Sequence, residues 1–323
     1  MPRLPPSLFW RARRDISPLA PTLLPACRDL ESASNELRWI REHVRAHPSS
    51  VPAALRVWAL VRKRGTGVPL QYVLGTQPFG PLEIRCKPGV LIPRPETEAY
   101  TLHLATLLPR TTPTTPLTIL DLCTGTGCIP LLLLHTHPGP LTLHALDISP
   151  SSISLARLNH RLHPSPSPSS TLTFHLADIF SPSPCSFPLP PNGEVDLLTS
   201  NPPYISPHHY SHTTARSVRN HEPRLALVPP EHIHTADLAR GGQRCRQDDV
   251  FYARLLDLAE TTRAKRVFFE VGGVQQARRV VEMVLERAEG EGEKGYGTVE
   301  IWRDEPGAGE RGERVVVGGR EVV

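Results

Sequence analysis

Short apolar runs recur through the second half of the chain, each closing on or beside a small or acidic residue. They are TILDL at 118–122, LTLHALD at 141–147, LTFHLAD at 172–178, VDLLTSN at 195–201 and RVFFEVG at 266–272. Strands that helices cover on both faces are apolar at nearly every position, and helical patterns separate several of these runs. The alternation predicts an α/β fold with a doubly wound, mostly parallel sheet. Two further runs, at 298–303 and 313–317, predict a terminal antiparallel hairpin.

The first part of the chain has helical periodicity instead. Apolar residues at spacings of three and four follow a serine cap and predict a helix over 34–45. A second helix is predicted over 52–64, where apolar residues recur every third position and a glycine follows as the stop. The residues that carry the two patterns are Ser34, Leu37, Ile40 and Val44, then Leu55, Trp58, Val61 and Gly65. Together they predict a small helical N-terminal domain.

Composition sets the outer limits. A chain of 323 residues has room for about two domains. Its mean hydropathy is −0.24 and no apolar stretch approaches the ~20 residues that cross a bilayer, so we expect a soluble protein without membrane contact. The six cysteines form no C-x-x-C pair, which argues against a zinc ribbon or a disulfide framework and favours a reducing compartment.

Charge is concentrated at the front of the chain. Residues 1–64 carry 12 Lys and Arg against 5 Asp and Glu, whereas residues 65–323 carry 24 against 27. The opening MPRLPPSLFWRARR contains four arginines and no acidic residue, a composition typical of an organelle transit peptide. We therefore predict a mitochondrial transit segment over 1–27 and a protein of the mitochondrial matrix, with the cytoplasm as the alternative.

A glycine turn follows the first predicted strand of the sheet. The sequence DLCTGTGC at 121–128 places Gly125 and Gly127 where the backbone must turn sharply and approach a ligand. Acidic residues close the next two runs: Asp147, suited to ribose hydroxyls, and Asp178, suited to an adenine amino group beside the apolar Ile179. The third glycine of the dinucleotide fingerprint is absent, which favours S-adenosylmethionine, a ligand without a pyrophosphate.

The fourth run ends in Asn-Pro-Pro-Tyr at 201–204, the most specific motif of the chain. A planar amide or aromatic NH₂ group is a poor nucleophile and must be held with its lone pair aimed at the methyl carbon. The Asn201 side-chain oxygen and the Pro202 carbonyl can each accept one hydrogen of such a group, and Tyr204 can pack on its plane. We predict Asn201, Pro202 and Tyr204 as the catalytic residues. No metal is required, and none is predicted.

On these motifs the chain resembles the HemK/PrmC family, the peptide chain release factor N5-glutamine methyltransferases, in its fungal mitochondrial form. The resemblance also rests on PLQYVLGTQPFG at 69–80, LIPRPETE at 91–98, VRNHEPRLALV at 218–228 and FEVGGVQ at 269–275. It implies a class I S-adenosylmethionine-dependent methyltransferase fold, Rossmann-like, with a seven-stranded, mostly parallel sheet and a C-terminal antiparallel hairpin. The domains expected are a substrate-binding helical domain at 28–80 and a catalytic domain at 81–323.

The resemblance also implies roles for individual residues. It predicts cofactor contacts from Cys123, Thr124, Gly125, Thr126, Gly127, Asp147, Asp178, Ile179 and Asn201. It predicts substrate contacts from Pro93, Arg94, Pro95, Glu96, Asn201, Pro202, Pro203 and Tyr204. The implied substrate is the glutamine of the Gly-Gly-Gln loop of a mitochondrial class 1 release factor, with S-adenosylmethionine as cofactor and the enzyme a monomer.

Three alternatives stay open on the sequence. A ribosomal protein L3 glutamine methyltransferase would use the same chemistry, although the Pro-Arg-Pro-Glu-Thr-Glu loop speaks against it. An adenine-N6 nucleic-acid methyltransferase would use the same Asn-Pro-Pro-Tyr pocket but should present a basic catalytic domain, which residues 65–323 lack. A non-catalytic adaptor would not need the intact glycine turn and Asn201. Two departures from the family pattern are Cys123, where glycine or alanine is common, and the stretch around Gly241, Gly242 and Gln243.

Overall fold

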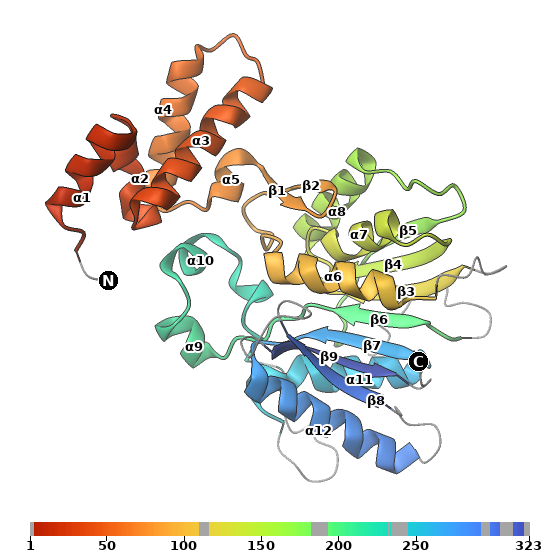
Figure 1. Cartoon of the computed structure of the whole chain (residues 1–323). Coiled ribbons are helices and arrows are strands. Elements are labelled where there is room, and N and C mark those ends of the chain that lie inside the picture. The colour runs from red at the N-terminus through yellow and green to blue at the C-terminus, as the bar shows by residue number, and fades with distance from the viewer. Residues whose placement is uncertain are drawn as a thin grey trace. The chain divides into compact units, whose positions relative to one another are not determined.

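The computed structural model describes residues 3–109, 116–181, 193–231, 233, 245–291, 298–303 and 313–319 (Figure 1). It divides into two compact units, which we treat separately. The helical unit comprises Met1–Thr76, Cys86–Pro88 and Thr214–Glu222. The sheet unit comprises Gln77–Arg85, Gly89–Thr213 and Pro223–Val323. The stretch around Gly241 that departs from the family pattern lies outside the described residues. No helix among those described is long and apolar enough to cross a membrane.

Helices build the first unit. They are α1 (Pro6–Arg11), the π-helical turn η1 (Ala12–Ile16), α2 (Ala20–Cys27), α3 (Leu30–Ala46), α4 (Ala53–Gly65), α5 (Leu70–Leu74) and α10 (Arg216–His221). The predicted helix over 34–45 exists, but it begins earlier: the Asp29 carboxylate accepts from the Ser32 N–H at 2.7 Å and caps α3. Ser34 therefore lies inside the helix, and its prediction as the cap was wrong. Aspartate and serine cap equally well, so residue type alone did not distinguish them.

The segment predicted as a transit peptide is folded into this unit. Ala12, Ala20, Leu23 and Leu24 are fully buried in one core with residues of α3 and α4. Helix α4 also approaches α2 closely, because a Cβ on Gly65 would lie 2.3 Å from the Thr22 carbonyl oxygen. The segment 6–27 thus contributes buried residues to the first unit's core.

The residues that carry the second helical pattern are not all buried. Helix α4 forms over Ala53–Gly65, and Val61 is buried. Leu55 and Trp58, however, are 58% and 47% exposed. The Arg62 guanidinium lies over the Trp58 ring at 4.6 Å, so the tryptophan packs against a cation at the surface and is not part of the core. The periodicity predicted the helix but not which of its residues are buried.

A seven-stranded sheet organises the second unit, as predicted. Its strands are β3 (Leu117–Leu122), β4 (Leu141–Asp147), β5 (Thr171–Leu176), β6 (Leu197–Ser200), β7 (Arg266–Glu270), β8 (Thr298–Arg303) and β9 (Glu313–Gly319). The order is β5-β4-β3-β6-β7-β9-β8. The strands from β5 to β7 are parallel to one another, and β9 pairs antiparallel with both β7 and β8. A small sheet that the sequence did not indicate pairs β1 (Thr76–Phe79) with β2 (Leu82–Arg85).

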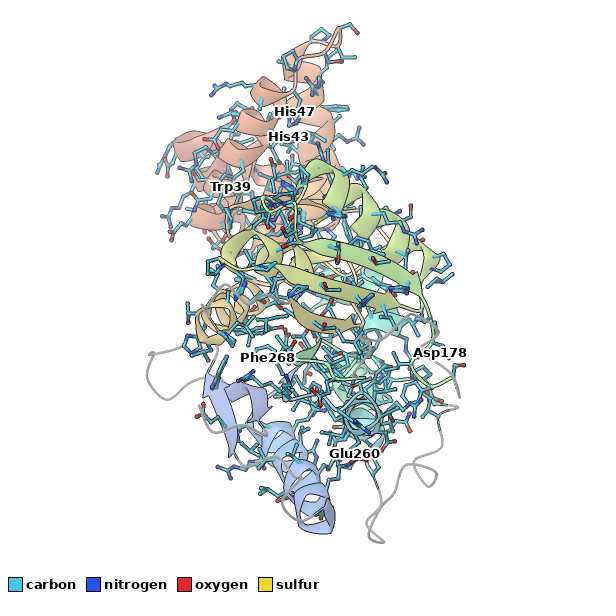
Figure 2. All side chains as sticks on the ribbon, turned by 90° about the vertical axis from the view of Figure 1, so that its right-hand side faces the viewer. Trp39, His43, His47, Asp178, Glu260 and Phe268 are labelled. Carbon is cyan, nitrogen blue, oxygen red and sulfur yellow. The ribbon has the colours of Figure 1, made fainter. Side chains whose placement is uncertain are left out.

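Helices cover both faces of this sheet (Figure 1). They are α6 (Pro95–Leu107), α7 (Cys128–Thr136), α8 (Pro150–Leu162), α11 (Val250–Thr261) and α12 (Val274–Glu291); α9 (Pro207–His212) and the 3₁₀ turns η2 (Arg224–Ala226) and η4 (Gln247–Asp249) lie in the connections. Successive strand residues point to opposite faces. Val267 and Phe269 accordingly pack in the core with α11 and α12, whereas Phe268 packs in the core with α6 and α7. Figure 2 shows Phe268 inside this unit.

Candidate active site

A cavity of about 210 Å³ opens in the sheet unit where strands β3, β4, β5 and β6 end. The predicted site residues that line it are Pro93, Arg94, Cys123, Thr124, Gly125, Thr126, Asp147, Asp178, Ile179, Asn201 and Pro203. The other predicted residues, Pro95, Glu96, Gly127, Pro202 and Tyr204, lie next to these in the chain but outside the cavity wall. The carboxyl edge of the parallel strands thus brings both predicted groups, cofactor and substrate residues, to one cavity.

The glycine turn after β3 forms the floor of the cavity. Gly125 has φ +56°, and a Cβ placed there would meet no protein atom within 4 Å, so the open space is left for a ligand. Gly127, at φ +79°, has a different reason to be glycine: its Cβ would press against Ala156 at 3.2 Å. Cys123 also adopts a left-handed conformation, φ +62°, which a side chain seldom tolerates. Glycine at this family position therefore has a backbone reason, and this chain accepts strain there.

Backbone amides fix the Asp147 carboxylate in place. Its Oδ2 accepts from the Gly125 N–H at 2.9 Å, and its Oδ1 accepts from the Ser149 N–H at 2.8 Å. Burial raises the pKa of Asp147, and these two hydrogen bonds oppose the rise. Each carboxylate oxygen keeps a second lone pair, so the group can still accept hydrogens from a ligand.

The wall beyond Asp147 is largely apolar. Asp178, labelled in Figure 2, holds its own turn by accepting from the Phe180 N–H at 2.9 Å. Ile179 is buried against the cavity. Phe180 and Phe251, which the sequence did not single out, also line it and meet edge to face with 5.0 Å between ring centroids. A flat apolar group such as an adenine ring fits this wall.

Asp121 lies behind the glycine turn and outside the cavity wall. Its side chain is 1% exposed, and its Oδ1 accepts from the Thr199 hydroxyl at 2.7 Å. Burial raises the pKa of this carboxyl to about 7, and the neighbouring Thr124 and Thr199 hydroxyls oppose that shift.

The orientation of the Asn201 amide is set by its nitrogen. Nδ2 donates to Glu270 Oε2 at 2.8 Å and lies 3.5 Å from the Thr97 hydroxyl. A carboxylate oxygen can only accept, so the atom that faces Glu270 must be the nitrogen. The Asn201 oxygen is therefore turned from Glu270, in a side chain that lines the cavity.

Glu270 is the residue that the sequence reasoning missed. It ends β7 and is 1% exposed. Its carboxylate accepts hydrogen bonds from four side chains, two on α6 and two in the Asn-Pro-Pro-Tyr motif. Besides Asn201 these are Thr97 at 2.8 Å, Tyr204 at 3.1 Å, and Tyr100. The signal was available, because Glu270 is an acidic residue at a strand end within FEVGGVQ, like Asp147 and Asp178 at theirs. Thr97 and Tyr100 lie on α6, so this carboxylate joins the PETE, NPPY and FEVGG motifs.

Gly272 of FEVGGVQ and Gln276, which directly follows this motif, support Tyr204. A Cβ on Gly272 would lie 3.1 Å from the Tyr204 ring, so a larger residue there would press on the ring. The Gln276 side chain accepts from the Gly272 N–H at 2.7 Å and donates to Asp249 at 2.9 Å. Tyr204 thus lies against a braced backbone with its hydroxyl on Glu270.

Curated proteins similar in sequence to this chain carry glutamine methyltransferase names. No family model matches the chain. Over 231 residues it is 40% identical to the mitochondrial MRF1 N(5)-glutamine methyltransferase MTQ1 of Saccharomyces cerevisiae, which covers 71% of this chain and 68% of that protein. It is 37% identical over 214 residues to the probable MRF1 mitochondrial N(5)-glutamine methyltransferase of Schizosaccharomyces pombe, covering 64% and 69%. The release factor glutamine methyltransferase of Mycolicibacterium smegmatis is 34% identical over 217 residues, covering 64% and 71%.

The strand order, the glycine turn and the acidic strand ends around one cavity define a class I S-adenosylmethionine-dependent methyltransferase. Among solved structures, the hMettl16 catalytic domain in complex with MAT2A 3′UTR hairpin 6 is similar with a TM-score of 0.49 and 15% identity, over 81% of this chain and 82% of that one. That likeness is too distant to carry a functional conclusion. On the sequence relatives, the chain belongs to the family of release factor N(5)-glutamine methyltransferases.

Proposed function

We propose that this protein transfers the methyl group of S-adenosylmethionine to the side-chain amide nitrogen of the glutamine in the Gly-Gly-Gln loop of a mitochondrial class 1 release factor. The observation that carries the proposal is the Asn201 amide, whose nitrogen is held by Glu270 so that its oxygen is left for the acceptor. Two of the relatives carry mitochondrial MRF1 glutamine methylation in their names, which supports the same substrate and compartment here.

The acceptor amide needs two hydrogen-bond acceptors and little else. Asn201 Oδ1 takes one hydrogen of the glutamine NH₂ group, and the Pro202 carbonyl takes the other, which aims the nitrogen lone pair along the line of attack. Both acceptors favour the positive charge that develops on nitrogen as it gains the methyl group. Pro202 and Pro203 contribute no backbone N–H groups that would compete for these oxygens. Pro93 and Arg94 flank the acceptor side, with Pro95 and Glu96 starting α6 behind them.

Cofactor contacts fall to the other end of the cavity. S-adenosylmethionine supplies a methyl group on a positively charged sulfur, so the leaving group is neutral and no strong base is required. Asp147 accepts from the ribose hydroxyls, Asp178 from the adenine amino group, and Ile179 lies against the ring. Cys123, Thr124, Gly125 and Thr126 contact the cofactor along the floor, with Gly127 packing the turn beneath them.

The names of two relatives support a mitochondrial setting, and we extend the proposal to the compartment and the oligomeric state. We expect the protein in the mitochondrial matrix, acting as a monomer on its release factor. Protease protection of the full chain in isolated mitochondria checks the first point, and light scattering checks the second. Protein in the cytosolic fraction alone would contradict the assigned compartment.

Nucleic-acid adenine methylation is the second candidate, since it would use the same pocket. It is less well supported, because residues 65–323 hold 24 basic against 27 acidic residues and a nucleic-acid enzyme needs a basic face.

The test incubates the purified full chain with labelled S-adenosylmethionine and, separately, a mitochondrial release factor, ribosomal protein L3 and adenine-containing oligonucleotides. Label is expected on the release factor and lost when its Gly-Gly-Gln glutamine is replaced by alanine. Asn201→Ala should abolish transfer and leave cofactor affinity within about twofold, since the cofactor keeps its other contacts whereas the acceptor loses the oxygen that orients its NH₂ group. Label on oligonucleotides alone would overturn the proposal.

A further inference from the structure

Four uncharged donors surround one buried carboxylate at the acceptor end of the cavity. Thr97, Tyr100 and Asn201 donate to Glu270 Oε2, and Tyr204 donates to Oε1. An ionised carboxylate accepts and never donates, and this set of donors matches that form. Burial, and then the Glu270 charge, raise the pKa of Tyr100 well above its usual range, so its hydroxyl stays a donor.

From this arrangement we infer that Glu270 is a positioning residue for methyl transfer, acting on the acceptor through the Asn201 amide; the inference rests on the proposed function. Glu270 does two things at a distance of 2.8 Å from Asn201 Nδ2. It prevents the amide from flipping, because the opposite orientation would set the Asn201 oxygen against a carboxylate oxygen. It also draws the amide hydrogens toward its charge and leaves the far oxygen a stronger acceptor.

The second effect bears on the rate of methyl transfer, because the charge on the acceptor nitrogen changes during the reaction. The acceptor nitrogen is neutral when glutamine binds and becomes positive as the bond to the methyl carbon forms and the bond to sulfur breaks. It then loses one of its two hydrogens as a proton to water, which leaves neutral N5-methylglutamine and S-adenosylhomocysteine. The negative charge of Glu270, acting through the polarised Asn201 amide, therefore stabilises the transition state more than the bound substrate. The same arrangement disfavours a glutamate in place of the glutamine, because its carboxylate would meet an acceptor oxygen backed by a second carboxylate.

The other contacts of the network show how Glu270 keeps its place. Thr97 and Tyr100 come from α6, and the Thr97 side chain is 2% exposed, the Tyr100 side chain 1%. Both hydroxyls bind the same oxygen as Asn201, so the carboxylate plane is fixed from two elements of the sheet unit. The PETE motif thereby contributes to the acceptor site through Thr97, which lines the cavity as Arg94 does and also binds Glu270.

The first test replaces the charge and keeps the shape. Glu270→Gln retains an oxygen that can accept from Asn201, so binding of S-adenosylmethionine should stay within about twofold while kcat falls by about 10- to 100-fold, as for loss of one stabilising group in a transition state. The KM for the release factor should change much less than kcat. The matched control is Asp196→Asn, another acid-to-amide change, at a residue that binds the Thr118 N–H and Lys265 just before β6 begins, at the end of the strand opposite Asn201. That variant should keep wild-type kcat.

A second variant covers the case in which Glu270→Gln does not fold. Glu270→Asp keeps the negative charge but withdraws it by one methylene from Asn201, and it too should lower kcat. In both variants, the preference of the enzyme for a release factor with glutamine over one with glutamate at this position of the Gly-Gly-Gln loop should become smaller. Wild-type kcat in either folded variant, or a loss confined to cofactor affinity, would overturn the role assigned to Glu270.

Failure of the substrate assignment would look different. If the wild-type protein labels L3 or oligonucleotides and leaves the release factor unlabelled, the proposed function fails. The ratio of kcat between Glu270→Gln and wild type is then measured on the acceptor that is labelled, and it still decides whether Glu270 acts through Asn201.

Discussion

The two units of the molecule differ in where their aromatic and polar side chains lie. In the sheet unit the aromatic residues Phe268, Phe269 and Tyr100 are buried, and the acidic residues at the strand ends are held by hydrogen bonds around one cavity. In the helical unit Trp10, Trp39 and Trp58 are 75%, 43% and 47% exposed. Figure 2 labels Trp39 and His43, which lie on α3, and His47, which directly follows it; the ring centroids of the two histidines are 4.4 Å apart.

This contrast separates a part built for fixed geometry from a part that presents surface. Methyl transfer depends on the placement of a few atoms, so the sheet unit uses its polar groups to lock one another. The helical unit leaves apolar rings beside arginines, as where Arg62 lies over Trp58, and residues 1–64 hold 12 basic against 5 acidic residues. Exposed aromatic and arginine side chains are the composition of protein contact surfaces. The predictions below test how far the two units differ.

The largest effect is expected from removing residues 1–27. This deletion takes Ala12, Ala20, Leu23 and Leu24 out of the first unit's core, and each buried leucine alone is worth about 2–5 kcal/mol. The helical unit should then lose its cooperative unfolding transition in calorimetry, while the transition of the sheet unit persists. Deletion of residues 2–5, which precede α1, is the control and should preserve both transitions. If the 28–323 chain keeps a folded helical unit, the contribution of this segment to the core is contradicted.

The result also bears on import. A presequence is ordinarily dispensable for the mature fold. Loss of the helical unit in the shortened chain would mean that a signal within 1–27 has to stay attached after import, or that processing stops before α1.

Next comes a matched pair of aromatic substitutions. Phe268→Ala empties a fully buried position between Tyr100 and Trp302, whose ring centroids lie 4.9 and 5.4 Å away, and should cost about 3–5 kcal/mol. Trp58→Ala removes a larger ring from the surface and should change the free energy of unfolding by less than about 0.5 kcal/mol. Denaturant unfolding measures both. Equal losses would erase the contrast between the units.

The sequence predicted the two units unequally, and the reason is physical. Strands β3, β6 and β7 are buried on both faces, so their apolar runs were sufficient to locate them. In α4 the periodicity of Leu55, Trp58 and Val61 predicted a helix, but it carries no information on which stripe a neighbour covers. Likewise the hairpin of β8 and β9 was expected, whereas the insertion of β9 between β7 and β8 depends on pairing that no local pattern contains.

The candidate site shows the same limit. Residues adjacent to a recognisable turn or motif, such as Gly125, Asp147 and Asn201, could be predicted because their chemistry and strand-end position are local. The role of Glu270 depends on its contacts with Thr97 and Tyr100, which are 173 and 170 residues away in the chain. Such a partnership appears only when the fold brings α6 to the end of β7.

Stability against pH should report the buried Asp121 carboxyl. Its pKa is about 7 in the folded protein against an ordinary value of 3.8, so its contribution to stability is fully present below about pH 4 and is lost as the pH rises through 7. Asp121→Asn keeps an acceptor for Thr199 and cannot ionise. The melting temperature of the wild type relative to this variant should therefore fall between pH 4 and 7 and level off above. A constant difference over that range would show that Asp121 does not titrate there.

The smallest effect is expected at Cys123, where the sheet unit accepts strain to build its floor. The residue has φ +62°, so alanine keeps the strained conformation while glycine relieves it. Cys123→Gly should be more stable than Cys123→Ala by about 1 kcal/mol, which reverses the usual order of these two residues. The control pair is Leu176→Ala and Leu176→Gly, at an exposed position in β5, where the alanine variant should be the more stable. If alanine is also the more stable at position 123, the turn relaxes when the thiol is removed, and the floor of the cavity is less rigid than the bonds from Gly125 to Asp147 imply.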